Sequence, residues 1–246
     1  MKLTVIGFWG AYPEKNEATS CFLLEEEDTK IILDCGSGAV SQIQNILDLR
    51  DIDAAVISHF HHDHIADIGV LTYSRVVDIN LKRTKKPLSI YAHREEDDSY
   101  TNLAKPPYTD VQSYDSSNPI YIGPFTIYFQ RTTHPVPCYA MKVISTKTNK
   151  SLIYSADTTY DENLIPFSLD TDLLIAESSF YANQSAAKFG HMNSVDVAKL
   201  ANQSQAKSVL LTHLPHFGVH QQLVDEVTER YTGTVAIAKT GYSVTI

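Results

Sequence analysis

Short runs of β-branched or apolar residues predict strands along the chain, and apolar residues at helical spacing predict helices between them. A hairpin is expected where Glu27-Asp28-Thr29 separates two of the strands. The expected strands cover residues 2–8, 21–26, 30–34, 54–57, 88–91, 125–131, 139–144, 152–154, 173–176 and 208–211. The expected helices cover residues 38–48, 65–79 and 194–202, and Ser194 is the expected N-cap of the last. Two halves of strands and helices indicate a single α/β domain, residues 1–246.

One segment has neither pattern. Residues 94–119 are polar, contain proline and have few β-branched apolar residues. A stretch of this kind within an ordered domain commonly covers a surface or a binding site. We therefore expect residues 94–119 to be the least structured part of the chain and a candidate lid.

The composition is that of a globular protein, with 43% hydrophobic and 20% charged residues. A net charge of −9 argues against an extended nucleic-acid surface and against anionic membranes, although a local positive site could still bind a phosphate. The basic run Lys82–Lys86 is a candidate for contact with RNA, and a solvated helix end is its plainer interpretation.

The three cysteines favour a reducing compartment. Cys21, Cys35 and Cys138 are scattered and odd in number, which fits free thiols better than a disulfide framework. The apolar run at the start of the chain reads as a strand and not as a signal peptide, and no apolar stretch is long enough to cross a bilayer. We expect a cytoplasmic protein without a membrane partner.

Candidate chemistry is concentrated in the stretch SHFHHDHIADIG, residues 58–69, which directly follows the predicted strand 54–57. His59 and His61 can converge on one point, while Asp63 and His64 turn toward a second. Imidazole and carboxylate ligands suit zinc, iron or manganese, and a four-coordinate zinc takes three or four protein ligands. The cluster therefore predicts two metal ions and requires further ligands downstream. His62 is expected to point away from its neighbours.

Three downstream residues can complete such a centre, because each follows the end of a predicted strand. These residues are His134, Asp157 and His213. The ligands expected for the first ion are His59, His61 and His134. Those expected for the second ion are Asp63, His64 and His213, with Asp157 bridging the two. Zn²⁺ is the expected ion and Mn²⁺ the alternative. A water between two such ions becomes a hydroxide near neutral pH and can attack phosphorus, with Asp63 holding or accepting the proton.

The motif His-x-His-x-Asp-His, with Asp34 in ILDCGSG upstream and the three downstream ligands, resembles the metallo-β-lactamase superfamily over nearly the whole chain. The resemblance implies an α/β fold, the four-layer αβ/βα sandwich, with two sheets face to face and a dinuclear metal site at the sheet edge. Asp34 is expected to orient a metal ligand and not to bind metal itself.

Within the superfamily the chain is most similar to the ribonuclease Z and cyclic phosphodiesterase branch. GFWGAYPEKNEATSCFLLE resembles the opening glycine-rich turn of that branch, and AESSF, GHMNS and LLTH resemble its closing motifs. The resemblance implies that Glu177 in AESSF and His191 in GHMNS form a catalytic pair. His191 would protonate the leaving alkoxide while Glu177 orients and charges the ring.

Two departures from ribonuclease Z stand out. His134 and Asp157 are only 23 residues apart, which leaves no room for the long substrate-binding arm. Ala176 occupies the position where ribonuclease Z usually has a histidine before the glutamate. The missing arm favours a small substrate over a precursor tRNA.

The sequence thus predicts a dinuclear metal-dependent hydrolase that acts on a small, cyclic or RNA-derived phosphodiester. A tRNA 3′-processing endonuclease is an alternative, which would need its grip from a partner subunit or from Lys82–Lys86. A lactone, lactam or thioester hydrolase is another, since the same metal ions can direct attack on a carbonyl. A homodimer that covers an apolar face is compatible with this branch.

Overall fold

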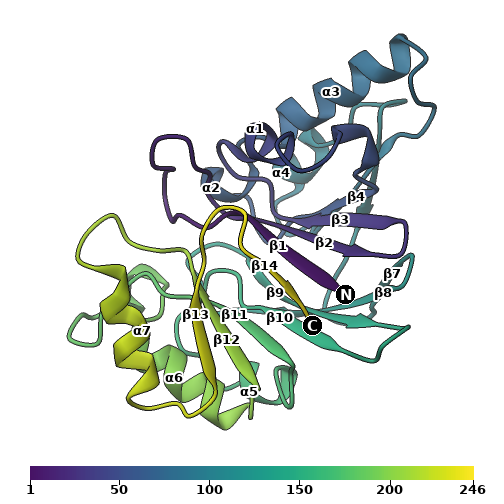
Figure 1. Ribbon diagram of the computed structural model, residues 1–246. Helices are drawn as coiled ribbons and strands as arrows, with labels where there is room; N and C mark the ends of the chain where they lie inside the picture. The colour runs from purple at the N-terminus through teal and green to yellow at the C-terminus, as the bar shows by residue number, and fades with distance from the viewer. The chain divides into compact units, whose positions relative to one another are not determined.

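The computed structural model describes residues 1–246, which form two compact units (Figure 1). The N-terminal unit consists of residues 2–115 together with residues 239–245 near the end of the chain. The C-terminal unit consists of residues 116–238 together with the two terminal residues, Met1 and Ile246. Each unit contains one seven-stranded sheet. No helix in the chain is both long and apolar enough to cross a membrane.

The sheet of the N-terminal unit has the strand order β14-β1-β2-β3-β4-β5-β6. Its strands are β1 (Lys2–Gly7), β2 (Cys21–Glu26), β3 (Thr29–Leu33), β4 (Ala54–Val56), β5 (Leu88–Ala92), β6 (Thr109–Ser113) and β14 (Ser243–Thr245). The pairings from β14 to β3 are antiparallel and those from β3 to β6 are parallel. Its helices are α1 (Ala39–Ile43), η1 (Leu49–Asp51), α2 (His62–Ile65), α3 (Ile68–Asn80) and α4 (Asp97–Asn102).

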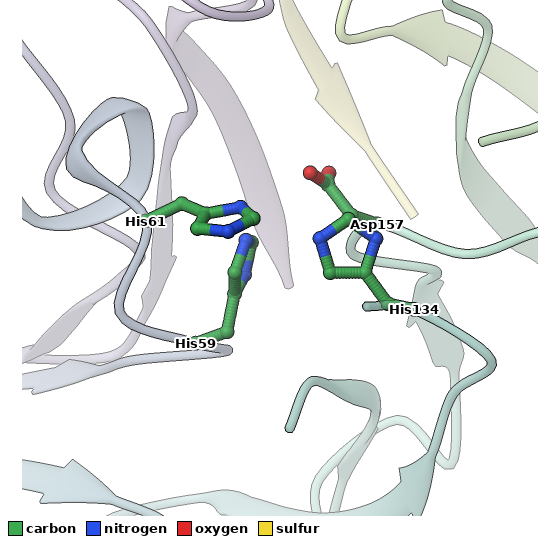
Figure 2. A group of neighbouring side chains, drawn as sticks. All are labelled: His59, His61, His134 and Asp157. Atoms are coloured by element: carbon green, nitrogen blue, oxygen red, sulfur yellow. The ribbon is translucent and has the colours of Figure 1, made fainter. Parts of the chain in front are cut away.

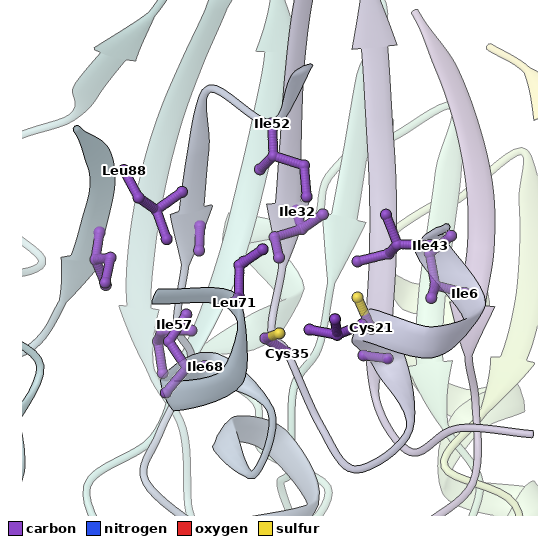
Figure 3. Packing of buried hydrophobic residues seen from close by; sticks show 14 of the residues in the cluster. Ile6, Cys21, Ile32, Cys35, Ile43, Ile52, Ile57, Ile68, Leu71 and Leu88 are labelled. Atoms are coloured by element: carbon purple, nitrogen blue, oxygen red, sulfur yellow. The ribbon is translucent and has the colours of Figure 1, made fainter. Parts of the chain in front are cut away.

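The core of the N-terminal unit is built from one face of this sheet and the apolar sides of α1 and α3 (Figure 3). Ile43 on α1, Leu71 on α3 and Ile32 on β3 are almost completely buried there, and each such side chain contributes roughly 1.5–3 kcal/mol of transfer free energy. Cys21 and Cys35 belong to the same cluster, and burial raises the pKa of both thiols well above the usual range. All three cysteines are buried as free thiols.

The sheet of the C-terminal unit has the order β13-β12-β11-β10-β9-β8-β7. Its strands are β7 (Ile120–Ile122), β8 (Phe125–Arg131), β9 (Tyr139–Ser145), β10 (Ser151–Tyr154), β11 (Leu173–Glu177), β12 (Ser208–Thr212) and β13 (Thr234–Ile237). Its helices are α5 (Leu164–Phe167), η2 (Ala187–Phe189), α6 (Ser194–Gln203) and α7 (His220–Thr228). Helices α6 and α7 pack against each other, and α7 also contacts β13.

The two sheets share one pairing pattern, since the pairings from β7 to β10 are antiparallel and those from β10 to β13 are parallel. Most of the candidate residues follow the ends of parallel strands, whereas His134 follows β8, both of whose pairings are antiparallel. Ser58 lies two residues beyond β4 and Ser179 lies two residues beyond β11, which are the second parallel strands of their sheets. Each of these serines makes a hydrogen bond with a predicted metal ligand, Ser58 with His59 and Ser179 with His213.

The predicted strands and the hairpin between β2 and β3 are present within a residue or two. The helix predicted over 38–48 is wrong in length, because α1 ends at Ile43 and Asp48 instead caps η1 by accepting the Arg50 N–H. The helix predicted over 65–79 is preceded by a separate α2, since the Asp67 N–H donates to the Cys35 carbonyl and interrupts the helical ladder.

Two further expectations need correction. Helix α6 is capped by Asn193 and not by Ser194, because the Asn193 side chain accepts the Asp196 N–H while the Asp196 carboxylate accepts the Asn193 N–H. Residues 94–119 are not the least structured part of the chain, because they contain α4 and the edge strand β6. Strand β6 is polar, and its parallel pairing with β5 supplies the backbone hydrogen bonds. The lid role of this segment stays a prediction.

Candidate metal centre

The N-terminal unit carries four of the predicted ligands on the loop and short helix that follow β4. The buried strand leads directly into His59, and the ring centroids of His59 and His61 are 4.7 Å apart (Figure 2). The His59 and His64 rings are 4.1 Å apart, and both side chains are fully buried. His64 Nε2 lies 3.7 Å from Oδ2 of Asp63. His62 is exposed, as predicted.

Asp34 is fully buried at the end of β3 and fixes the orientation of two of these histidines. Its Oδ2 accepts a hydrogen bond from His64 Nδ1 at 2.7 Å and another from the Ser58 hydroxyl at 2.8 Å. Because the Ser58 proton is directed at Asp34, the hydroxyl oxygen accepts from His59 Nδ1, 3.0 Å away. In both rings Nδ1 is therefore the donor, which leaves the Nε2 lone pair for a metal ion.

Asp63 is positioned by the glycine-rich turn near the start of the chain. Its Oδ2 accepts the Ala11 N–H at 2.8 Å, and Ala11 adopts a left-handed conformation with φ 61°. Gly36 allows the close approach of α2, because a Cβ at this position would lie 2.1 Å from the Asp63 carbonyl oxygen. The Ala11 N–H thus holds the Asp63 carboxylate, while Gly36 leaves room for its backbone.

The C-terminal unit carries the other three predicted ligands on the loops after β8, β10 and β12. His213 Nε2 lies 3.5 Å from Oδ1 of Asp157, and both side chains are buried. His134 and Asp157 each follow the end of their strand by three residues (Figure 2). His134 Nδ1 donates to the Gly190 carbonyl at 3.0 Å, so its Nε2 is likewise left for a metal ion.

Glu177 is a completely buried carboxylate at the end of β11. Its Oε1 accepts from His191 Nδ1 at 3.0 Å, and its Oε2 accepts from the Ser179 hydroxyl at 2.8 Å. The Ser179 oxygen in turn lies 2.8 Å from Nδ1 of His213, which must be the donor in this contact. Glu177 thus orients one histidine directly and a second histidine through a serine.

His191 lies where it could act on a substrate or bind a metal ion. The ligand atoms of Asp157, His191 and His213 lie within 4.8 Å of one another, and the rings of His191 and His213 stack at 5.1 Å. The His191 side chain is 19% exposed, whereas that of its partner Glu177 is 1% exposed. A histidine with one nitrogen on a buried carboxylate and a solvent-accessible edge suits proton transfer.

The donor set fits divalent metal ions. Four of the five predicted histidine ligands use Nδ1 in a hydrogen bond, and each unit adds one carboxylate ligand, Asp63 or Asp157. Imidazole and carboxylate donors without a thiolate suit zinc or manganese. The four histidines with Nδ1 engaged in this way are His59, His64, His134 and His213.

Sequence reasoning did not find the residues that orient the ligands. Ser58 and Ser179 each adjoin a recognised motif residue, and the sequence contains no signal for the direction of a hydroxyl group. Gly190 was visible only as part of GHMNS, although its carbonyl accepts from His134. A Cβ at Gly190 would lie 2.3 Å from the Pro135 ring, and its φ of 83° is left-handed, so glycine is required there.

Comparison with known proteins identifies the family. The sequence model of the "Beta-lactamase superfamily domain" matches residues 29–214. The chain belongs to the metallo-β-lactamase superfamily. It is 43% identical over 242 residues to the probable metallo-hydrolase YhfI of Bacillus subtilis, and the alignment covers 98% of each chain. The crystal structure of YhfI matches with a TM-score of 0.96, covering 99% of this chain and 98% of YhfI.

More distant members of the superfamily share the fold. The short form of human tRNase Z matches with a TM-score of 0.77 and 20% identity, covering 100% of this chain and 99% of the human chain. A diphosphatase from the PhnP family matches with a TM-score of 0.74 and 15% identity, covering 100% of this chain and 97% of the other. The predicted superfamily and the metallo-β-lactamase fold are confirmed, and the matches support a metallo-hydrolase.

Proposed function

We propose that this metallo-hydrolase is a phosphodiesterase that cleaves a small, cyclic or RNA-derived phosphodiester. The contact that supports this proposal most directly is the 3.0 Å hydrogen bond between His191 and Glu177, beside Asp157 and His213. The alkoxide released from a phosphodiester is a poor leaving group, so a positioned proton donor accelerates its departure. Glu177 engages Nδ1 of His191, which leaves Nε2 to deliver that proton.

The proposed metal centre uses the seven predicted ligands, and Zn²⁺ is the proposed ion. The first ion would be held by His59, His61 and His134. The second would be held by Asp63, His64 and His213, with Asp157 bridging. Bound divalent ions would lower the pKa of a water toward neutral and neutralise charge on the phosphate oxygens. Asp63, fixed by the Ala11 N–H, would hold the proton of the attacking water.

The local structure favours a small substrate. The segment between His134 and Asp157 is filled by the hairpin of β9 and β10, so it contains no protruding arm. The low-identity relationship to a tRNase Z and to a diphosphatase concerns the fold, and it supports phosphoester chemistry by analogy alone. We therefore place a small or cyclic phosphodiester ahead of a precursor tRNA as the substrate.

The test is a side-by-side assay of protein reconstituted with Zn²⁺ or Mn²⁺. The substrates are bis-p-nitrophenyl phosphate, a 2′,3′-cyclic nucleotide, a precursor tRNA and a lactone. We expect turnover of the two diesters without defined cleavage of the tRNA. Turnover of the lactone alone would refute the phosphodiesterase assignment, and cleavage of the tRNA at its 3′ end would favour the endonuclease.

A further inference from the structure

Three phenylalanines form a cluster beside His191 in the C-terminal unit. The rings of Phe180 and Phe189 stack at 5.5 Å with an interplanar angle of 5°, and the Phe217 ring lies 6.4 Å from Phe180. The Phe180 ring is 6.3 Å from the His191 ring. Phe189 is 51% exposed and Phe217 is 47% exposed, so large apolar surfaces lie open next to the candidate proton donor.

The position of Phe217 is fixed by its surroundings. The Tyr181 hydroxyl donates to the Phe217 carbonyl at 3.0 Å, and the two rings are 5.9 Å apart. Gly218 has φ 77°, and a Cβ there would lie 2.4 Å from the Tyr181 hydroxyl, so this loop conformation requires glycine. His220 Nε2 donates to the Pro215 carbonyl at 2.7 Å and closes the same loop. An exposed ring held in this manner is suited to binding a ligand without a large ordering cost.

The other two phenylalanines are attached directly to residues of the candidate centre. Phe180 follows Ser179, which orients His213, and Phe189 precedes Gly190, whose carbonyl accepts from His134. The Lys188 ammonium lies 4.7 Å from the centroid of the Phe189 ring. Aromatic rings, one cation and the candidate proton donor therefore lie close together, which matches a ligand with a planar group and a phosphate.

We propose that the cluster of Phe180, Phe189 and Phe217 binds the nucleobase of a nucleoside-containing phosphodiester and so selects this class of substrate. The inference rests on the proposed phosphodiesterase function and specifies its substrate. Stacking on an aromatic side chain tolerates different bases, so the cluster selects nucleosides as a class and not one base. Lys188 lies close enough to the stack to attract the phosphate charge.

The kinetic test compares two substrates that differ only in the base: adenosine 2′,3′-cyclic phosphate and methyl riboside 2,3-cyclic phosphate. For Phe217→Leu and Phe189→Leu we expect kcat/KM for the nucleotide to fall by about 5- to 100-fold, with little change for the base-free substrate. Phe217→Trp should retain the preference. Tyr121→Leu is the matched control, because Tyr121 on β7 is 71% exposed in the same unit. An equal fall for both substrates would refute the inference.

A binding measurement separates this inference from the proposed reaction. Calorimetry with adenosine 5′-monophosphate and with ribose 5-phosphate requires no turnover. We expect the wild-type protein to prefer the nucleotide, and Phe217→Leu to remove the preference. Equal binding of both ligands by the wild type would overturn the inference even if diesters are hydrolysed. A preference that Phe217→Leu removes, in a protein that hydrolyses no diester, would support the nucleoside site and refute the phosphodiesterase.

Discussion

The hydroxyl oxygen of Ser179 lies 2.8 Å from Nδ1 of His213 and accepts a hydrogen bond from the Nδ1–H group. The serine proton points to Glu177, so a buried carboxylate acts on the histidine through the serine. Ser58 performs the same role between Asp34 and His59 in the N-terminal unit. Both serines lie two residues beyond the second parallel strand of their sheets. The same carboxylate–serine–histidine arrangement therefore occurs at the equivalent position in each unit.

Ser179→Ala should therefore weaken metal binding. Without the hydroxyl, Nδ1 of His213 loses its acceptor and the ring loses its fixed orientation, which typically lowers metal affinity by about 10- to 100-fold. Chelator competition followed by mass-spectrometric metal analysis measures the effect. Ser178→Ala is the neighbouring control, because the Ser178 hydroxyl donates its hydrogen bond to the Ala176 carbonyl and not to a group of the candidate centre. Equal metal affinity in the two variants would contradict the proposed role of Ser179.

His191→Ala tests whether His191 is a proton donor or a metal ligand. As a proton donor, its loss should leave metal content unchanged and lower kcat on alkyl diesters by about two to four orders of magnitude. The loss should be much smaller on nitrophenyl diesters, whose leaving group needs no proton. Asp63→Ala should instead lose metal together with nearly all turnover. His62→Ala is the control, because this histidine is exposed. Loss of a metal ion from His191→Ala would assign it as a ligand.

The candidate ligands could be found from the sequence because their residue types are distinctive and because each follows a short buried strand. His59 and His213 show the pattern. His59 follows the buried strand β4 by three residues, and His213 comes directly after the largely buried strand β12. The orienting serines could not be found, because a hydroxyl is assigned a role only by the atoms around it. Ser179 has three such neighbours, two of which belong to His213 and one to Glu177.

Three of the elements that sequence reasoning missed lack a strong local signal of their own. Strand β14 is exposed over most of its length and is defined by its antiparallel pairing with β1, at the opposite end of the chain. Strand β6 is polar and depends on β5 for its hydrogen bonds. Helix α7 lacks a side-chain N-cap and buries only Leu223 and Val227, a weak apolar pattern for nine residues. Tertiary pairing decided these elements, and intrinsic propensity did not.

Two glycine substitutions should change stability in opposite directions. Gly190→Ala would place a Cβ against Pro135 at a left-handed φ and displace the carbonyl that accepts from His134, so we expect a loss of about 1–3 kcal/mol. Gly69→Ala lies on α3, where a Cβ would meet nothing within 4 Å, and should gain about 0.5–1 kcal/mol. Urea denaturation measures both changes. A neutral or stabilising Gly190→Ala would show that the loop tolerates a side chain.

Asp172 should make the stability of the C-terminal unit depend on acid pH. Burial acts to raise the pKa of Asp172, but hydrogen bonds from Lys150, Lys207 and the Ser151 N–H outweigh it and lower the pKa to about 2. In the unfolded chain the same carboxyl titrates near 3.9. The stabilising contribution is therefore complete above about pH 5 and disappears as the pH falls toward 2.

For Asp172→Asn we expect the free energy of unfolding to fall by about 1–2 kcal/mol at pH 7, a figure reduced from the full linkage value because both lysines are exposed to solvent. The difference from the wild type should shrink as the pH is lowered from 5 to 3. In this range the Asp172 carboxyl of the unfolded chain binds a proton that the native carboxylate does not, and this favours unfolding of the wild type. Urea denaturation across this range measures the difference. Asp170→Asn, at an exposed neighbouring aspartate, provides the control. A difference that stays constant from pH 7 to pH 3 would show that the Asp172 charge contributes nothing and that the substitution acts through the geometry of the turn.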